Sequence, residues 1–265
     1  MAITIVRNNV AMGVKKRVIP LILFDDWKMV KTINFSTIRN YGSPVVSAKV
    51  YNAQKVDELI YLDIRASLNM QQPDFDAISD IVRQCFMPVT IGGGVRTVEQ
   101  AQKLFKIGAD KVAINSSAIE NPNLIKDIAY TFGSQSVVIS IDVRKIGRSY
   151  EVFTYSGTKP TGMSAFDWAR KAEDLGAGEI LINSIDNDGM MEGYDLNLLS
   201  QMYKSVRLPV IAAGGAGHPQ HLVDAIAEAN VSAVAVGSLF LYTEYNSITS
   251  KKYMKDNKID VRTSS

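Results

Sequence analysis

Short apolar runs alternate along the chain with longer stretches in which apolar residues recur at helical spacing. A strand covered on both faces reads as a continuous apolar run, so these runs predict buried strands. Eight are expected, over residues 17–24, 58–63, 89–91, 111–115, 137–142, 179–183, 210–213 and 233–236. Helices are expected over 45–55, 74–86, 97–107, 164–175 and 196–206, and from 121 and 219 onward. Strands that alternate with helices in this way indicate a parallel sheet with helices on its faces.

Local signals add detail between these elements. Thr97 is expected to cap the helix that follows it, and Asn121 is expected to cap a helix whose first residue is Pro122. Residues 25–43 read as a long loop that contains Lys31, and residues 150–155 read as half of a small hairpin.

The second half of the chain repeats the first. Met87-Pro-Val-Thr-Ile-Gly-Gly-Gly is matched by Leu208-Pro-Val-Ile-Ala-Ala-Gly-Gly, and Asp57-Glu-Leu-Ile-Tyr-Leu is echoed by Gly178-Glu-Ile-Leu-Ile-Asn. A repeat of about half the chain length, with four strand–helix units in each half, predicts a (β/α)₈ TIM barrel with an internal two-fold half-barrel repeat. An open, doubly wound sheet is the alternative, but it does not predict a half-chain repeat.

Length and composition agree with one such domain. The chain has 265 residues, of which 46% are hydrophobic, and about 250 residues are typical of this barrel. We expect an N-terminal extension over 1–16, a single barrel over 17–258 and a C-terminal tail over 259–265. A net charge of +2 without long basic runs gives no reason to expect binding to nucleic acid. The sequence has no apolar stretch long enough to cross a membrane and no signal-peptide pattern, so a cytoplasmic protein is expected.

Polar residues and glycines follow the predicted strands. In a (β/α)₈ barrel the chemistry lies at the carboxyl ends of the strands, where carboxylates and amides have no packing role. Glycines at such a position let backbone N–H groups approach a phosphate. The alternative for each residue is a hydrogen-bonded cap of its own loop. That alternative is weakest for Asp142, which directly follows an apolar run and is expected to project into the barrel.

Four charged residues open strands instead, at the opposite end of the barrel. Arg17 and Lys111 are positive, and Glu58 and Glu179 are negative. Two interpretations are open from spacing alone. The four side chains are either solvated strand starts or a ring of paired charges that closes the bottom of the barrel and leaves a polar route through it.

Several motifs together resemble one family. They are Arg17-Val-Ile-Pro, Val30-Lys-Thr-Ile-Asn-Phe, Gly92-Gly-Gly-Val-Arg, Gly108-Ala-Asp-Lys-Val-Ala-Ile-Asn, Asp186-Asn-Asp-Gly and Gly214-Gly-Ala-Gly. From about Lys16 to about Tyr245 the chain is similar to the cyclase subunit of imidazole glycerol phosphate synthase. The resemblance implies a half-repeated barrel that docks a glutaminase subunit on its N-terminal face. Ammonia then passes through the barrel to the C-terminal face, where a ribonucleotide with two phosphates is cleaved and cyclised.

The resemblance also implies roles for individual residues, and it implies no metal and no cofactor. The ammonia gate corresponds to Arg17, Glu58, Lys111 and Glu179, and residues facing the glutaminase correspond to Asp110 and Gln135. Polar catalytic residues correspond to Lys31, Asp63, Asn115, Asp142 and Asp188. The two phosphate sites correspond to Gly93, Gly94, Asn115, Gly214, Gly215, Gly237 and Ser238.

One position departs from the family. The first strand of the family ends in Cys-Leu-Asp-Val with an essential aspartate, and here Leu23 takes its place. The internal repeat shows the same gap, because the half-barrel counterpart of Asp142 is a leucine. Cyclisation needs two carboxylates to move protons, so we expect the chain not to cyclise. Asp25 and Asp26 lie just beyond Leu23, at a spacing that would misplace a catalytic carboxylate by several ångströms. Ala213 also replaces a serine common in the family.

Three functions follow from this combination. The first is an ammonia-conducting subunit that serves a separate amidotransferase, which amidinates a nucleotide-activated lipopolysaccharide sugar. The leucine in place of the aspartate resembles cyclase-like proteins of surface-sugar gene clusters, and the resemblance implies this role. The alternative is an authentic cyclase in which Asp25 or Asp26 substitutes for the missing acid. A third possibility is a catalytically silent partner that binds and activates the glutaminase. In the first two, the ligand is a phosphorylated or nucleotide-linked small molecule.

Overall fold

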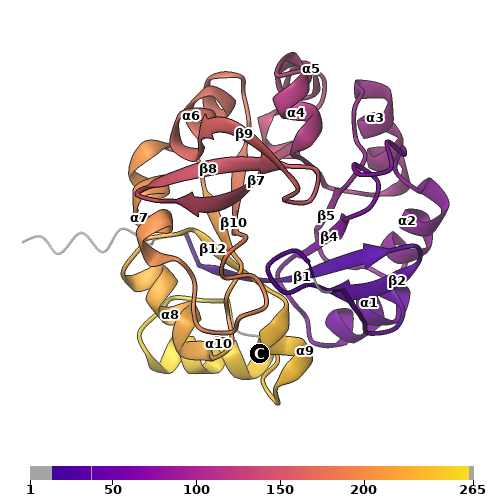
Figure 1. The fold of residues 1–265 in the computed structure, drawn as a ribbon. Coiled ribbons are helices and arrows are strands. Elements are labelled where there is room, and N and C mark those ends of the chain that lie inside the picture. The colour runs from indigo at the N-terminus through magenta and orange to yellow at the C-terminus, as the bar shows by residue number, and fades with distance from the viewer. Residues whose placement is uncertain (1–13, 37, 263–265) are drawn as a thin grey trace, which may run out of the picture.

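Eight parallel strands close into a barrel in the computed structural model, which describes residues 14–36 and 38–262 (Figure 1). The barrel strands are β1 (Arg17–Asp25), β4 (Leu59–Asp63), β5 (Val89–Gly92), β6 (Lys111–Ile114), β7 (Val137–Ile146), β10 (Glu179–Ser184), β11 (Val210–Ala213) and β12 (Ala233–Val236). β1 pairs with both β4 and β12, and β10 pairs with both β7 and β11. The (β/α)₈ prediction is therefore confirmed, and the open-sheet alternative is wrong.

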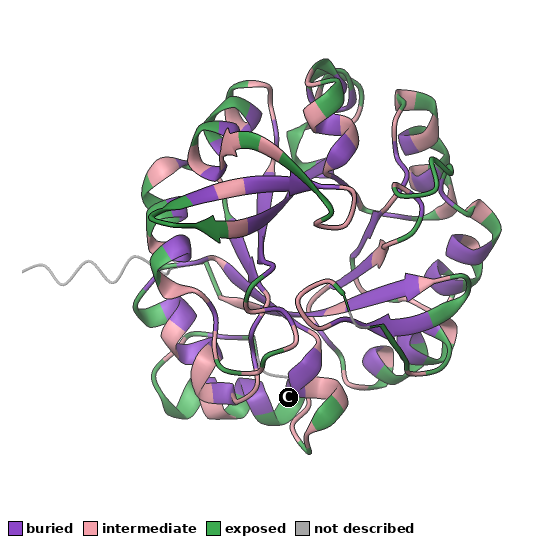
Figure 2. Ribbon diagram, in the orientation of Figure 1, coloured by how far each residue is buried: buried purple, intermediate pink, exposed green. Residues whose placement is uncertain are grey.

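Helices surround the barrel and bury one face each against it (Figure 2). They are α1 (Pro44–Ala53), α2 (Phe75–Val82), α3 (Val98–Ile107), α4 (Ser116–Glu120), α5 (Asn123–Phe132), α6 (Ala165–Asp174), α7 (Leu196–Ser205), α8 (Pro219–Ala227), α9 (Ser238–Tyr242) and α10 (Ser247–Asp256), with a 3₁₀ turn at Ser134–Ser136. None of these helices is both long and apolar enough to cross a membrane. The main hydrophobic core lies between the helices and the outer face of the strands.

A second, smaller core fills the barrel itself. Its members are mostly branched aliphatic residues and alanines from the barrel strands, namely Ile19, Ile60, Ala113, Val138, Leu181, Ile211, Ala213, Ala233 and Ala235. Because strand side chains alternate between the two faces, these residues point inward while their neighbours pack against helices. The axis of the barrel is thus apolar between its two polar ends.

Two antiparallel extensions rise from the C-terminal face, toward the viewer in Figure 1. β2 (Lys28–Lys31) folds back on β1 and pairs with the short β3 (Arg39–Asn40), so the prediction of a long loop over 25–43 misses these two strands. The reason is the turn at Asp26 and Trp27, whose positive φ angles of 46° and 64° return the chain onto β1. β8 (Ser149–Thr154) and β9 (Lys159–Ser164) extend β7, which confirms the predicted hairpin.

Helix boundaries differ from prediction at one clear point. Thr97 caps α3 as expected, since its side chain accepts the N–H of Gln100. Asn121 does not cap α5. Its N–H donates to Ser117 O and closes α4, so Pro122 takes the capping position and α5 begins one residue later than predicted.

Part of the predicted tail packs on the barrel. Lys16 and Val261 form a parallel β-bridge, and Val261 is buried in the main core. Lys16 N also donates to Asp260 O at 2.8 Å. Most of the predicted N-terminal extension, residues 1–13, lies outside the described residues.

Candidate functional site

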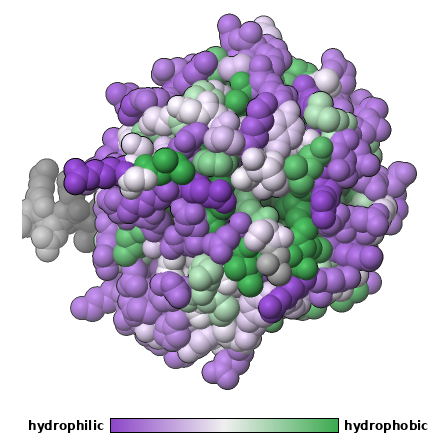
Figure 3. Space-filling model, in the orientation of Figure 1, coloured by the Kyte–Doolittle hydropathy of each residue, from purple (hydrophilic) through white to green (hydrophobic). Residues whose placement is uncertain are grey.

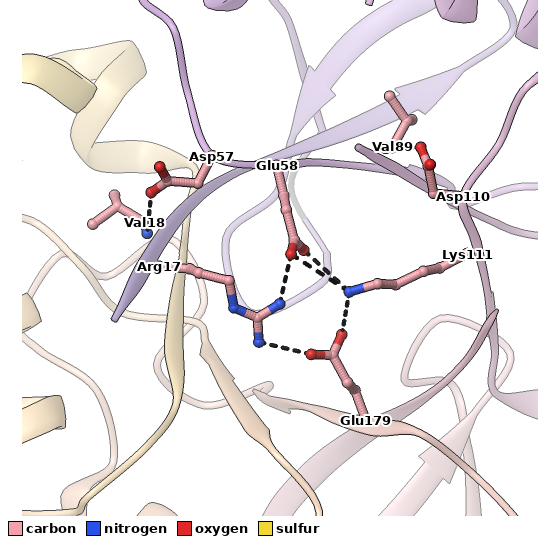
Figure 4. A network of polar contacts seen from close by, with 8 residues as sticks. All are labelled: Arg17, Val18, Asp57, Glu58, Val89, Asp110, Lys111 and Glu179. Atoms are coloured by element: carbon pink, nitrogen blue, oxygen red, sulfur yellow. Dashed lines mark hydrogen bonds and ion pairs between the residues drawn. The ribbon is translucent and has the colours of Figure 1, made fainter. Parts of the chain in front are cut away.

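A closed ring of four charges spans the N-terminal mouth of the barrel (Figure 4). The Arg17 guanidinium lies 2.7 Å from Glu58 Oε1 and 2.7 Å from Glu179 Oε1. Lys111 Nζ completes the ring, at 3.3 Å from Glu58 Oε2 and 2.7 Å from Glu179 Oε2. The charges therefore alternate in sign around the barrel axis.

This geometry decides between the two interpretations of the strand starts. All four side chains are largely shielded, the most exposed being Arg17 at 21%. Burial of unpaired charges is costly, so the four hold one another in place. They are a structural ring and not four separately solvated charges.

The two residues expected to face a glutaminase lie on the same end of the molecule. Asp110 is exposed directly before β6, and its Oδ2 accepts the N–H of Val89 at 2.8 Å (Figure 4). Gln135 is exposed in the 3₁₀ turn before β7 and donates from Nε2 to Phe132 O. Both side chains are accessible to a partner, and their role in binding one stays a prediction.

At the opposite end, a first pocket forms around Asp142. Asn115 Nδ2 donates to Asp142 Oδ2 at 2.7 Å, so β6 and β7 hold the carboxylate between them. Burial raises the pKa of Asp142 to about 7, and the nearby charge of Asp188 acts in the same direction. A carboxyl group with this pKa exchanges protons near neutral pH, as a general acid or base requires.

Asp63 lines the same pocket but also caps its own loop. Its Oδ1 accepts the N–H groups of Arg65 and Ala66 at 2.8 and 2.9 Å. Burial raises the pKa of Asp63, although these two hydrogen bonds oppose the shift. Asp63 therefore caps its own loop, as the alternative for strand-end residues predicted. Its carboxylate is also the second carboxylate, beside that of Asp142, that lines this pocket.

A second pocket lies beside the first and contains a buried ion pair. Lys31 Nζ lies 2.5 Å from Asp188 Oδ1, and Thr32 donates to the other oxygen of the same carboxylate. Gly214, Gly215, Gly237 and Ser238 line this pocket as well. The unpredicted strand β2 is what brings Lys31 to the site, because a free loop would not fix its position.

Backbone geometry requires glycine at positions in both loops, apart from any role in binding phosphate. Gly93 and Gly214 have positive φ angles of 106° and 84°. A Cβ at Gly93 would lie 2.5 Å from Asp63 O, and one at Gly214 would lie 2.6 Å from Ser184 O. Glycine is therefore required for the loops to pack, and phosphate binding at Gly93, Gly94, Gly214 and Gly215 stays a prediction.

Leu23 occupies the place that the family resemblance assigns to an aspartate. It is 8% exposed and lines the same pocket as Asp142. Asp25 and Asp26 line a neighbouring pocket, which shares Asp63 with the pocket of Asp142, and Asp25 forms an ion pair with Arg65 there at 3.0 Å. Neither lines the pocket of Asp142 itself, and the substitution of one of them for the missing aspartate at Leu23 stays a prediction. Figure 3 shows hydrophobic residues gathered near the centre of this face, within mostly hydrophilic surroundings.

Sequence reasoning did not assign a role to several polar residues of the pockets. Asn183, Ser140, Ser116 and Ser156 all line the pocket of Asp142. The position of Asn183 at the end of a predicted strand was a usable signal. Ser156 lies in the turn between β8 and β9, and its hydroxyl donates a hydrogen bond to Ile64 O. No local sequence pattern reveals this contact.

The raised pKa of Asp142 gives a prediction for stability. Its carboxyl loses a proton near pH 4 in the unfolded chain and near pH 7 in the folded one, so its contribution to the free energy of unfolding falls as pH rises from about 4 to 7. Asp142→Asn removes this penalty and still accepts the hydrogen bond from Asn115. We expect the variant to be more stable than the wild type by about 2–4 kcal/mol at pH 8 and not at pH 4, as measured by urea unfolding. A difference that is the same at both pH values would contradict the assignment.

Comparisons with known proteins identify the family. The model of the family described as "Histidine biosynthesis protein" matches residues 17–246. Proteins called "Imidazole glycerol phosphate synthase subunit HisF" are 43% identical to the chain in Pelodictyon phaeoclathratiforme, 42% in Chlorobium phaeobacteroides and 44% in Prosthecochloris aestuarii. Each alignment spans 247 residues, which is 93% of this chain and 98% of the relative. With the closed barrel, the charge ring and the carboxylate pocket in place, the chain belongs to the histidine biosynthesis protein family, among the relatives of the HisF subunit of imidazole glycerol phosphate synthase.

Proposed function

We propose that the chain is the barrel subunit of a glutamine amidotransferase of the imidazole glycerol phosphate synthase type. A glutaminase binds the N-terminal face, and its ammonia passes the charge ring and the apolar interior to the pocket of Asp142. The observation that carries this proposal is the closed ring of Arg17, Glu58, Lys111 and Glu179. The four paired charges close the mouth in this arrangement, and separating one pair, such as Lys111 and Glu58 at 3.3 Å, would open it to a molecule as small as ammonia.

The relatives support cyclisation of a ribonucleotide better than amidination of a sugar. These relatives are named as the synthase subunit HisF, and the name refers to no sugar. We therefore place the cyclase reaction ahead of the sugar reaction. In this assignment Asp142 exchanges protons with the substrate, Asn115 orients it, and the glycine loops hold the two phosphates.

Leu23 favours a second candidate. A leucine lines the pocket where the reaction calls for a second acid–base group, and Asp63 is engaged by two backbone N–H groups. Ammonia that reaches this pocket would then serve a separate amidotransferase that modifies a nucleotide-activated lipopolysaccharide sugar. The barrel would contribute passage and ligand binding without cyclising anything.

Turnover of the ribonucleotide with ammonium salt separates the two candidates, because ammonium bypasses the glutaminase. We expect the purified chain to turn the substrate over about 10²–10⁴-fold more slowly than a cyclase with both carboxylates, since one acid–base group is missing. Growth of a histidine auxotroph that lacks its own cyclase subunit gives a second readout. No turnover above the uncatalysed rate would exclude the cyclase reaction and leave the sugar reaction or a silent partner that activates the glutaminase.

A further inference from the structure

A buried ion pair lies outside the pockets, between α10 and the residues that lead into β4. The Nζ atom of Lys251 on α10 lies 2.8 Å from Asp57 Oδ2, and the two side chains are only 5% and 7% exposed. Taking two charges out of water is costly, and apolar residues of similar volume often give the same or greater stability. The stability of the fold therefore does not by itself account for this pair, and its neighbours must be considered.

The Asp57 carboxylate joins two strands at the level of the charge ring. Asp57 directly precedes Glu58 in the sequence. Its Oδ2 also accepts the N–H of Val18, the residue that follows Arg17, at 3.4 Å (Figure 4). The backbone ladder between β1 and β4 begins farther along both strands, beyond the ring residues. The side chain of Asp57 therefore links the two strand starts at a level that the ladder has not reached.

This link depends on Lys251. A contact of 3.4 Å between Val18 N and Asp57 Oδ2 is long for a hydrogen bond and holds the carboxylate only weakly. The ion pair at 2.8 Å fixes the same oxygen from the other side. A buried carboxylate also needs a neutralising partner, because an unpaired charge in the interior is costly. Lys251 therefore both compensates the charge of Asp57 and holds it in place.

The other half of the ring has a related link that needs no lysine. Asp110 directly precedes Lys111, and its Oδ2 accepts the N–H of Val89 at the start of β5 (Figure 4). This contact is 2.8 Å long, and Asp110 is exposed to solvent. A carboxylate before a ring residue thus joins neighbouring strand starts twice, and only the buried one is paired with a cation of α10.

The segment that follows α10 holds the chain on the other side of Arg17. Lys16 N donates to Asp260 O at 2.8 Å, and Lys16 forms a parallel β-bridge with Val261. The residues before and after Arg17 are therefore both attached to the last helix of the barrel or to the segment behind it. A change in this helix is transmitted to the Arg17 side of the ring.

We infer that Lys251 and Asp57 are positioning residues of the charge ring. The pair holds the starts of β1 and β4 at the separation that lets Arg17 reach Glu58 at 2.7 Å. Without the pair, the two strand starts separate more often and the ring opens on the side of α10. The contact between the ring residues of β6 and β10 does not depend on this pair and stays closed. Only the consequence for ammonia rests on the proposed function.

The first test replaces the pair without leaving a lone buried charge. Asp57→Leu combined with Lys251→Met puts apolar side chains in both places, whereas Lys251→Met alone leaves the carboxylate unpaired and destabilises the fold. Backbone hydrogen exchange of the isolated chain is followed by mass spectrometry. We expect the double variant to exchange about tenfold faster at the starts of β1 and β4, as the loss of one hydrogen bond would cause. The starts of β6 and β10 should exchange like those of the wild type, whereas a general loss of stability would raise exchange in every strand.

The second test is the ratio of product to hydrolysed glutamine in the complex with the cognate glutaminase. We expect the double variant to lower this ratio toward the value of Lys111→Ala, which breaks the ring directly. Turnover with ammonium salt should stay at the wild-type level, because this ammonia reaches the pocket from the solvent. A residue that only stabilised the fold would not separate the two activities in this way.

Lys252→Met combined with Asp256→Leu is the matched control. It removes another ion pair of α10, at 3.0 Å, whose side chains are 78% and 63% exposed, and it should change neither measurement. Three results would overturn the inference: unchanged exchange at the starts of β1 and β4, an equal rise in all barrel strands, or a product ratio that falls in Lys111→Ala but not in the double variant. An unchanged ratio in Lys111→Ala itself would reject ammonia passage, and the exchange measurement would still decide whether the pair positions the ring.

Discussion

Leu23→Asp is expected to raise ammonium-dependent turnover of the ribonucleotide by about 10²–10⁴-fold, because it supplies a second acid–base group to the pocket of Asp142. The position is suitable, since Leu23 lines that pocket and lies near the end of a rigid barrel strand. The remaining machinery is already present, including the hydrogen bond from Asn115 to Asp142. Steady-state turnover with saturating ammonium measures the effect.

Two variants separate catalysis from a change of shape. Leu23→Asn matches the size of aspartate without its charge and should give no gain. Adding Asp142→Asn to Leu23→Asp should abolish the gain, because both carboxylates are then needed together. If Leu23→Asn accelerates the reaction as much as Leu23→Asp, the missing acid is not what limits the chain.

Lys111→Ala is expected to uncouple glutamine hydrolysis from ammonia use in the complex with the cognate glutaminase. The substitution removes one of the two cations of the ring and leaves Glu58 and Glu179 sharing Arg17 alone. Water then enters beside the unpaired carboxylates and ammonia escapes, so less product forms for each glutamine hydrolysed. Breaking the partly buried network should also lower the free energy of unfolding by about 1–3 kcal/mol, below the cost of breaking a fully buried pair.

The ratio of product to hydrolysed glutamine measures the coupling. Lys111→Arg retains a cation at this position and should stay close to the wild type. Lys103→Ala on α3, an exposed lysine away from the ring, serves as a control for the general effect of the substitution. An unchanged ratio in Lys111→Ala would favour a silent partner that activates the glutaminase and passes nothing.

The barrel could be predicted because its signals are local. Apolar runs such as 179–183 read as buried strands wherever they occur, and the two Gly-Gly loops revealed the repeat without any knowledge of packing. The four charged residues at the strand starts could be predicted to lie together, because the amino ends of parallel strands meet at one end of a barrel.

The rest depended on contacts between distant segments. β2 could not be predicted, because Lys28–Lys31 forms a strand only after the turn at Asp26 and Trp27 brings it against β1. The separation of Asp25 from the pocket is set by its ion pair with Arg65, 40 residues away in sequence. The side-chain oxygen of Asn183 has no hydrogen-bond partner among the described residues, and this becomes visible only once the segments around it have positions.

The most direct test of ammonia passage is an isotope competition in the complex with the cognate glutaminase. Glutamine labelled with ¹⁵N in its side-chain amide is supplied together with an excess of unlabelled ammonium, and the ¹⁵N content of the product is measured by mass spectrometry. If ammonia travels through the charge ring and the barrel to the pocket of Asp142, the product of the wild type carries mostly ¹⁵N despite the unlabelled excess. Lys111→Ala should shift the product toward ¹⁴N. A wild-type product with the same isotope ratio as the ammonium in solution would contradict the account.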